Sequence, residues 1–63
     1  MAKILYINER LKEAGITGHE LARRMNISYV RANAITKSQT LRVDTLAAVA
    51  NATNIDIRDF FRP

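Results

Sequence analysis

An all-α fold of five short helices is predicted for this chain by three observations. Apolar residues recur at helical spacing, for example Val43, Leu46 and Val49. Residues 17–36 carry start and stop signals for two short helices joined by a tight turn. The chain has 63 residues and no cysteine, so we expect one domain over residues 1–63, with a single core held by helix packing alone.

The start of the chain fits an amphipathic helix over residues 3–14. Its apolar stripe consists of Ile4, Ile7, Leu11 and Ala14. Gly15 follows, and glycine adopts the left-handed conformation that ends many helices. Ile16 is then expected to pack just before the next helix begins.

A second structure for the same segment remains open. Residues 3–7 are also a β-prone run, which can pair with residues 40–43 as a tiny two-stranded sheet. Asn8 would then cap a shorter helix from Glu9. Both alternatives bury Leu11 and Ala14.

The next helix is predicted to begin after Thr17 and to end at Asn26. The Thr17 side chain can accept a backbone N–H, while Glu20, three residues on, reaches back to the Thr17 amide as a capping box. The apolar face of this helix is Leu21, Ala22 and Met25. Asn is the non-glycine residue that best tolerates the left-handed conformation needed at the turn.

A further helix is predicted over residues 28–36. Ile27 folds under the turn, Ser28 is the N-cap, and Ala32 and Ile35 point inward. The other face carries Tyr29, Val30, Arg31 and Asn33.

The remaining chain reads as a polar loop over residues 36–40, a helix within residues 41–52 and a short closing helix capped by Asp56. We expect Phe60 to close the core. Phe61 is then either a second core residue or an exposed apolar contact for another subunit.

Positive charge is concentrated in one stretch of the chain. The net charge is +4, and residues 17–42 hold five Lys or Arg against Glu20 alone. This stretch therefore has the same excess as the whole chain, as expected for a partner that carries phosphates. A scattered solvated surface is the alternative.

The segment resembles the helix-turn-helix of the phage repressor and Cro family (XRE type). The resemblance rests on Leu21, Ala22, Asn26, Ile27, Ala32 and Ile35 at fixed offsets, and the order of predicted helices extends it over essentially the whole chain. It implies a compact, repressor-like helix-turn-helix domain. Four departures bear on the angle of the helix over 28–36: Gly18 stands where the family usually has Gln, Ala32 where it has a bulky aliphatic residue, Thr53 where it has Leu, and Ser38 where it often has Gly. Tyr29 in place of a short polar residue is also unusual.

The resemblance implies binding of double-stranded DNA by a small transcription regulator, with the helix over 28–36 in the major groove. The implied base-contacting residues are Tyr29, Val30, Arg31 and Asn33. The implied phosphate-contacting residues are Thr17, Gly18, His19, Ser28, Lys37, Ser38, Gln39 and Arg42. We expect a homodimer that pairs through Phe61, either in free solution or only on DNA.

Other classes of function are less favoured by the residues. A protein-interaction module, antitoxin-like or anti-repressor, is the alternative, because Tyr29, Val30 and Ala34 make the outer face rather apolar. His19 is the only histidine and no cysteine is present, so no metal site is expected. We expect no enzyme activity, no cofactor, no small-molecule ligand and no membrane span, in a cytoplasmic protein of a bacterial cell or phage-infected host.

Overall fold

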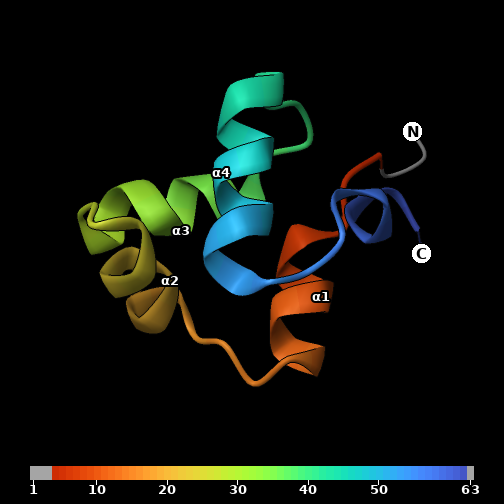
Figure 1. The fold of residues 1–63 in the computed structure, drawn as a ribbon. Helices are drawn as coiled ribbons and strands as arrows, with labels where there is room; N and C mark the ends of the chain where they lie inside the picture. Colours follow the sequence, from red (N-terminus) through yellow and green to blue (C-terminus); the bar gives the residue numbers. More distant parts are fainter. Residues whose placement is uncertain (1–3, 63) are drawn as a thin grey trace.

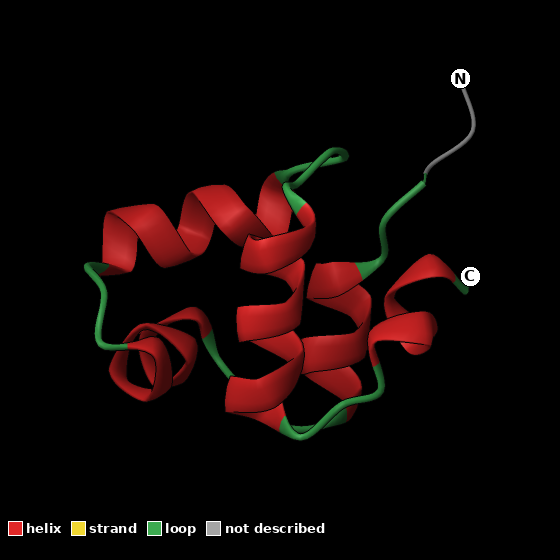
Figure 2. Cartoon of the chain, turned by 45° about the horizontal axis from the view of Figure 1, so that its top comes forward, coloured by secondary structure: helices red, strands yellow, loops and turns green. Residues whose placement is uncertain are grey.

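A computed structural model describes residues 4–62, which form four α-helices and one 3-10 helix. The elements are α1 (Ile7–Glu13), α2 (Gly18–Met25), α3 (Tyr29–Lys37), α4 (Val43–Thr53) and the 3-10 helix η1 (Ile57–Phe61). Figure 2 shows this part of the chain as helices and loops only. The predicted all-α fold is confirmed.

The strand predicted near the N-terminus is wrong within residues 4–7; Lys3 lies outside the described residues. The Ile4 N–H donates to the Gln39 side chain at 3.1 Å, and the Tyr6 N–H donates to the Phe60 carbonyl at 2.7 Å. Each of these amides is therefore bound by a single residue that is far away in the sequence. No backbone ladder forms with residues 40–43.

Both predicted starts of the first helix also need correction. Helix α1 begins at Ile7, so Asn8 lies inside it, and the residue at its N-cap is Tyr6, which makes no side-chain cap. Ile4 is 56% exposed, while Ile7 is 1% exposed. Burial of Ile7 thus sets the first helical turn more strongly than the capping preference of Asn8 does.

Helix α1 ends as predicted at Gly15, whose φ is +73°. The Gly15 N–H donates to the Lys12 carbonyl and the Ile16 N–H to the Leu11 carbonyl, a Schellman motif that brings Ile16 onto Leu11. Ala14 was expected to be buried, but it is exposed because the helix has already ended at Glu13.

The helices are arranged with α4 in the middle. Helices α2 and α3 lie together at the left of Figure 1, and α1 and η1 lie at the right. Helix α4 packs on α2 and η1, and α1 packs on α3 and η1. None of the helices within residues 4–62 is long and apolar enough to cross a membrane.

One hydrophobic core joins all five elements. Its fully buried large side chains are Ile7, Leu11, Leu21, Val49 and Phe60. Phe60 is thereby confirmed as the residue that closes the core. Phe61 is not a second core residue, because 51% of it is exposed.

Two residues of α4 differ from prediction. Val43 was placed on the inward stripe, but it is 78% exposed, because it is the first residue of the helix and lies beyond the core. Thr53 was expected to interrupt the helix, but it is the last helical residue and is buried. Its hydroxyl donates to the Val49 carbonyl at 2.8 Å, which satisfies the buried polar group. Asn54, with φ +60°, ends the helix instead.

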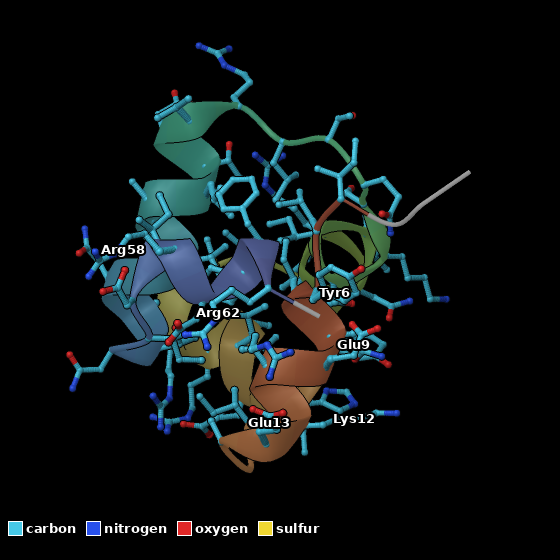
Figure 3. All side chains as sticks on the ribbon, turned by 90° about the vertical axis from the view of Figure 1, so that its right-hand side faces the viewer. Tyr6, Glu9, Lys12, Glu13, Arg58 and Arg62 are labelled. Atoms are coloured by element: carbon cyan, nitrogen blue, oxygen red, sulfur yellow. The ribbon has the colours of Figure 1, made fainter. Side chains whose placement is uncertain are left out.

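The beginning and the end of the described chain are tied together. Besides the bond from Tyr6 to Phe60, the Arg10 guanidinium donates to the Arg62 carbonyl at 2.9 Å. Figure 3 looks onto this end of the molecule and shows Arg62 between Arg58 and Tyr6. Here the Asp56 side chain accepts the Arg58 N–H, so the predicted cap of the closing helix is confirmed.

Candidate nucleic-acid interface

The turn between α2 and α3 is built by three local signals. Asn26 is left-handed, with φ +58°. The Ile27 N–H donates to the Ala22 carbonyl at 3.0 Å, which folds Ile27 under the turn. Ser28 then accepts the Arg31 N–H at 3.1 Å and starts α3. The predicted end of α2, the turn and the predicted N-cap of α3 are confirmed.

Helix α3 presents a row of side chains away from the core. Ala32 and Ile35 are buried, and because successive residues of an α-helix turn by about 100°, Val30, Ala34 and Lys37 lie on the opposite side. All three are exposed, Val30 at 78%. This row is the surface of α3 that an external partner can reach most directly.

The four side chains predicted to contact bases do not share one face. Val30 is in the outward row, while Tyr29 turns toward α2. Arg31 is exposed on the flank of α3 toward α4, where it lines a hollow with Asp44 and Thr45. Asn33 is half-buried.

Ala34 is the member of the row that the candidate residues omitted. Its spacing of four from Val30 could have indicated it, since positions i and i+4 lie on one face of a helix. In the sequence it was instead counted with the apolar outer face that favours a protein-interaction module. An apolar side chain can still contact the methyl group of thymine.

The residues predicted to contact phosphates form two groups. Thr17, Gly18 and His19 lie at the start of α2, where the Thr17 hydroxyl accepts the Glu20 N–H at 3.1 Å. Lys37, Ser38, Gln39 and Arg42 lie at the end of α3 and in the loop after it. Ser28 lies apart from both groups, at the start of α3.

Several residues of the second group already have partners. The Ser38 hydroxyl donates to the Ala34 carbonyl at 2.9 Å. The Gln39 side chain holds the Ile4 amide, and Arg42 lies 3.4 Å from the carboxylate of Asp44. Lys37 is exposed and has no carboxylate partner among residues 4–62.

The capping box predicted for α2 is only half formed. The Glu20 carboxylate does not reach back to Thr17, but accepts hydrogen bonds from the guanidinium groups of Arg23 and Arg24. These bonds, that from Arg24 first, lower the pKa of the Glu20 carboxyl below its ordinary value. Two consecutive arginines one turn further along the helix attract the carboxylate more strongly than one backbone amide does.

This ion pairing changes where the positive charge is available. Arg24 also donates to the Ala52 carbonyl of α4 at 3.3 Å, so it faces α4. Neither Arg31 nor Lys37 has a carboxylate within 4.0 Å in the described chain. The charge of α3, rather than that of α2, is therefore free to meet a phosphate.

The first turn of α2 carries an aromatic contact with α3. The rings of His19 and Tyr29 are stacked, with centroids 4.0 Å apart and planes inclined by 14°. Gly18 lies beneath the Tyr29 ring: a β-carbon at position 18 would come within 3.1 Å of Tyr29 Cε1. Tyr29 is thus held on α2, although 44% of it is exposed.

Comparison with known proteins agrees with this architecture. A family model described as the Cro/C1-type HTH DNA-binding domain matches residues 6–63. Comparisons with curated proteins and with solved structures gave no match. Because the match spans nearly the entire chain, and the tight turn between α2 and α3 is the feature that defines a helix-turn-helix, the chain belongs to the Cro/C1-type HTH DNA-binding domain family.

Proposed function

We propose that the chain binds double-stranded DNA in a sequence-specific manner, as a small transcription regulator of the phage repressor and Cro type that inserts α3 into the major groove. The observation that carries the proposal is the outward row of Val30, Ala34 and Lys37, opposite the buried face of α3. A helix supported from behind by a second helix fits the major groove, which is about 12 Å wide. Membership of a DNA-binding family supports the same ligand.

In this proposal the bases are read by three kinds of contact. Val30 and Ala34 contact thymine methyl groups. The Arg31 guanidinium reads guanine through two hydrogen bonds, and the Asn33 amide reads adenine. Arg31 is exposed and has no carboxylate partner in the described chain, so its binding to a base breaks no ion pair.

The phosphates are contacted at both ends of the recognition surface. Lys37 supplies the main positive charge. The neighbouring contacts are made by Thr17, Gly18, His19, Ser28, Ser38, Gln39 and Arg42. Such contacts fix the position of the protein on the duplex and carry no sequence information themselves.

The test is the salt dependence of binding. A preferred site is first selected from random duplexes, and its affinity is then measured by fluorescence titration at several salt concentrations. With four to six phosphates contacted, log K should fall against log salt with a slope of about −4 to −5. A flat response, or no enrichment of any sequence, would refute the proposal.

A matched pair of lysine variants sharpens this test. Lys37→Ala should weaken binding to preferred and random DNA alike and reduce the slope by about 1. Lys12→Ala removes an exposed lysine of α1 (Figure 3), outside the proposed surface, and should leave both affinity and slope unchanged. Equal effects of the two variants would mean that the slope reflects overall charge and not this surface.

A second candidate function is a protein-interaction module that keeps the fold, antitoxin-like or anti-repressor. The apolar surface of Val30 and Ala34 favours it, because two of the three residues in the outward row carry no polar group. This alternative predicts the flat salt response described above.

We also propose that two copies bind a two-fold symmetric site. One recognition helix covers only about four or five base pairs, so a single copy discriminates poorly among genomic sites. The exposed ring of Phe61, with Ile4 beside the same hollow, is the apolar surface offered for the contact.

A further inference from the structure

The contact among Gly18, His19 and Tyr29 is a second connection between α2 and α3. The first connection is the turn at Asn26 and Ile27, which joins the end of α2 to the start of α3. The stacked rings join the start of α2 to the start of α3. The two connections lie at opposite ends of α2 and both meet the start of α3, so α3 cannot pivot on the turn alone.

Apart from the stacked rings, α2 buries Leu21 and Ala22, and α3 buries Ala32 and Ile35. Ala22 and Ala32, the two nearest the turn, each contribute only a methyl group. An aromatic pair adds a directional contact to such packing, because stacked rings have a preferred separation and inclination.

Gly18 is what makes this contact sterically possible. A β-carbon at position 18 would lie 3.1 Å from the Tyr29 ring, closer than ordinary van der Waals separation. The φ angle of Gly18 is not in the left-handed region. Glycine is therefore needed here for space and not for backbone conformation.

We propose that His19 and Tyr29, seated on Gly18, are positioning residues that fix the angle of α3 on α2 and so decide which of its side chains face the DNA. Tyr29 then acts through its ring and reads no base. The part of this inference that concerns DNA rests on the proposed function. The angle of α3 is a property of the free protein and is measurable without DNA.

The first experiment measures that angle from residual dipolar couplings of backbone N–H groups in the free protein. Tyr29→Phe keeps the ring and should leave the couplings of α3 unchanged. Tyr29→Leu removes the stack, and Gly18→Ala pushes the ring away, so each should change the couplings of α3 relative to α4. The double variant should differ little from Tyr29→Leu, because the added methyl no longer meets a ring.

Unchanged couplings in Tyr29→Leu would overturn the proposal, whether or not DNA is bound. Val30→Ala is the matched control, an exposed neighbour on the same helix that should leave the couplings unchanged. Tyr29 is 44% exposed, so its replacement is not expected to unfold the domain, and the spectrum of each variant verifies this.

The second experiment compares base preference in selections from random duplexes. If the ring positions α3, Tyr29→Phe should retain the preference of the original protein. Tyr29→Leu should weaken selection at every position of the half-site, with a loss of affinity of up to about tenfold, the upper range for one aromatic pair. Loss of preference at a single base pair would instead identify Tyr29 as a base reader. Failure of the original protein to select DNA would refute the proposed function but not the result on the helix angle.

Discussion

Val30 combines high exposure with an apolar side chain at the start of the outward row of α3. In the proposed complex it covers a thymine methyl group. Replacing that thymine by deoxyuridine removes only the methyl, and the expected loss is about 0.8 kcal/mol, or roughly fourfold in affinity. Fluorescence anisotropy on a set of duplexes, each with one such replacement, measures it.

The matching variant is Val30→Ala. It should bind the original and the deoxyuridine duplexes with nearly equal affinity, because the contact to the methyl is already lost. Continued sensitivity of Val30→Ala to the same replacement would assign the methyl contact to another residue, with Ala34 the next along the row.

At the scale of single residues, what the sequence reveals depends on how local the interaction is. Thr17, Asn26 and Ser28 were predicted correctly, since a cap or a left-handed turn involves only the next few backbone groups. The neighbours of Tyr29 and Arg31 are not specified in this local way, because they depend on how α3 packs against α2 and α4.

Among the elements, η1 begins with an exposed ion pair that contributes to its stability. The Arg58 guanidinium and backbone N–H bind the Asp56 carboxylate and lower its pKa from 3.8 to about 2. A carboxyl whose pKa is lower in the folded state contributes stability above pH about 4, and this contribution disappears as the pH falls toward 2. The free energy of unfolding should therefore fall over this range, as urea titrations at pH 2 to 5 can measure.

The variant that isolates this effect is Asp56→Asn, which keeps an acceptor for the cap but has no charge to titrate. Its unfolding free energy should change less between pH 4 and 2 than that of the original protein. Arg58→Ala should behave in the same way, and combining the two should add little. Identical pH profiles for Asp56→Asn and the original protein would contradict this role of the ion pair.

The elements themselves were largely predictable, except at the N-terminus. The periodicities that gave α2, α3 and α4 repeat over two or more turns and end at recognisable caps. The segment before α1 has no such signal, and its amides are bound by Gln39 and Phe60, far away in sequence. Single-sequence patterns do not specify which distant residue will satisfy an amide, so the helix and strand alternatives could not be separated.

For the whole molecule, the proposed dimer sets the geometry of the operator. Two copies on a two-fold site would hold their α3 helices about 34 Å apart, one turn of DNA. The apolar surface at Phe61 is small, so we expect a monomer in free solution at micromolar concentration and two copies on a palindrome. Analytical ultracentrifugation with half-site and palindromic duplexes distinguishes these species.

Phe61→Ser should reduce binding of the second copy to the palindrome and leave binding to the half-site unchanged. The half-site duplex thus controls for effects of the variant on folding. A single copy on the palindrome, with the same affinity for Phe61→Ser and the original protein, would exclude this dimer.

The bond from the Tyr6 amide to the Phe60 carbonyl has a consequence for how the domain opens. It joins the segment that leads into α1 to the backbone of Phe60, whose ring fills the core, so we expect that separating the two segments exposes Ile7 or Phe60, both almost fully buried. Hydrogen exchange at Tyr6 should therefore require the complete loss of structure, and its rate should match that of the slowest amides in α4. We therefore expect Tyr6 and Phe60 to unfold together with the centre of the domain.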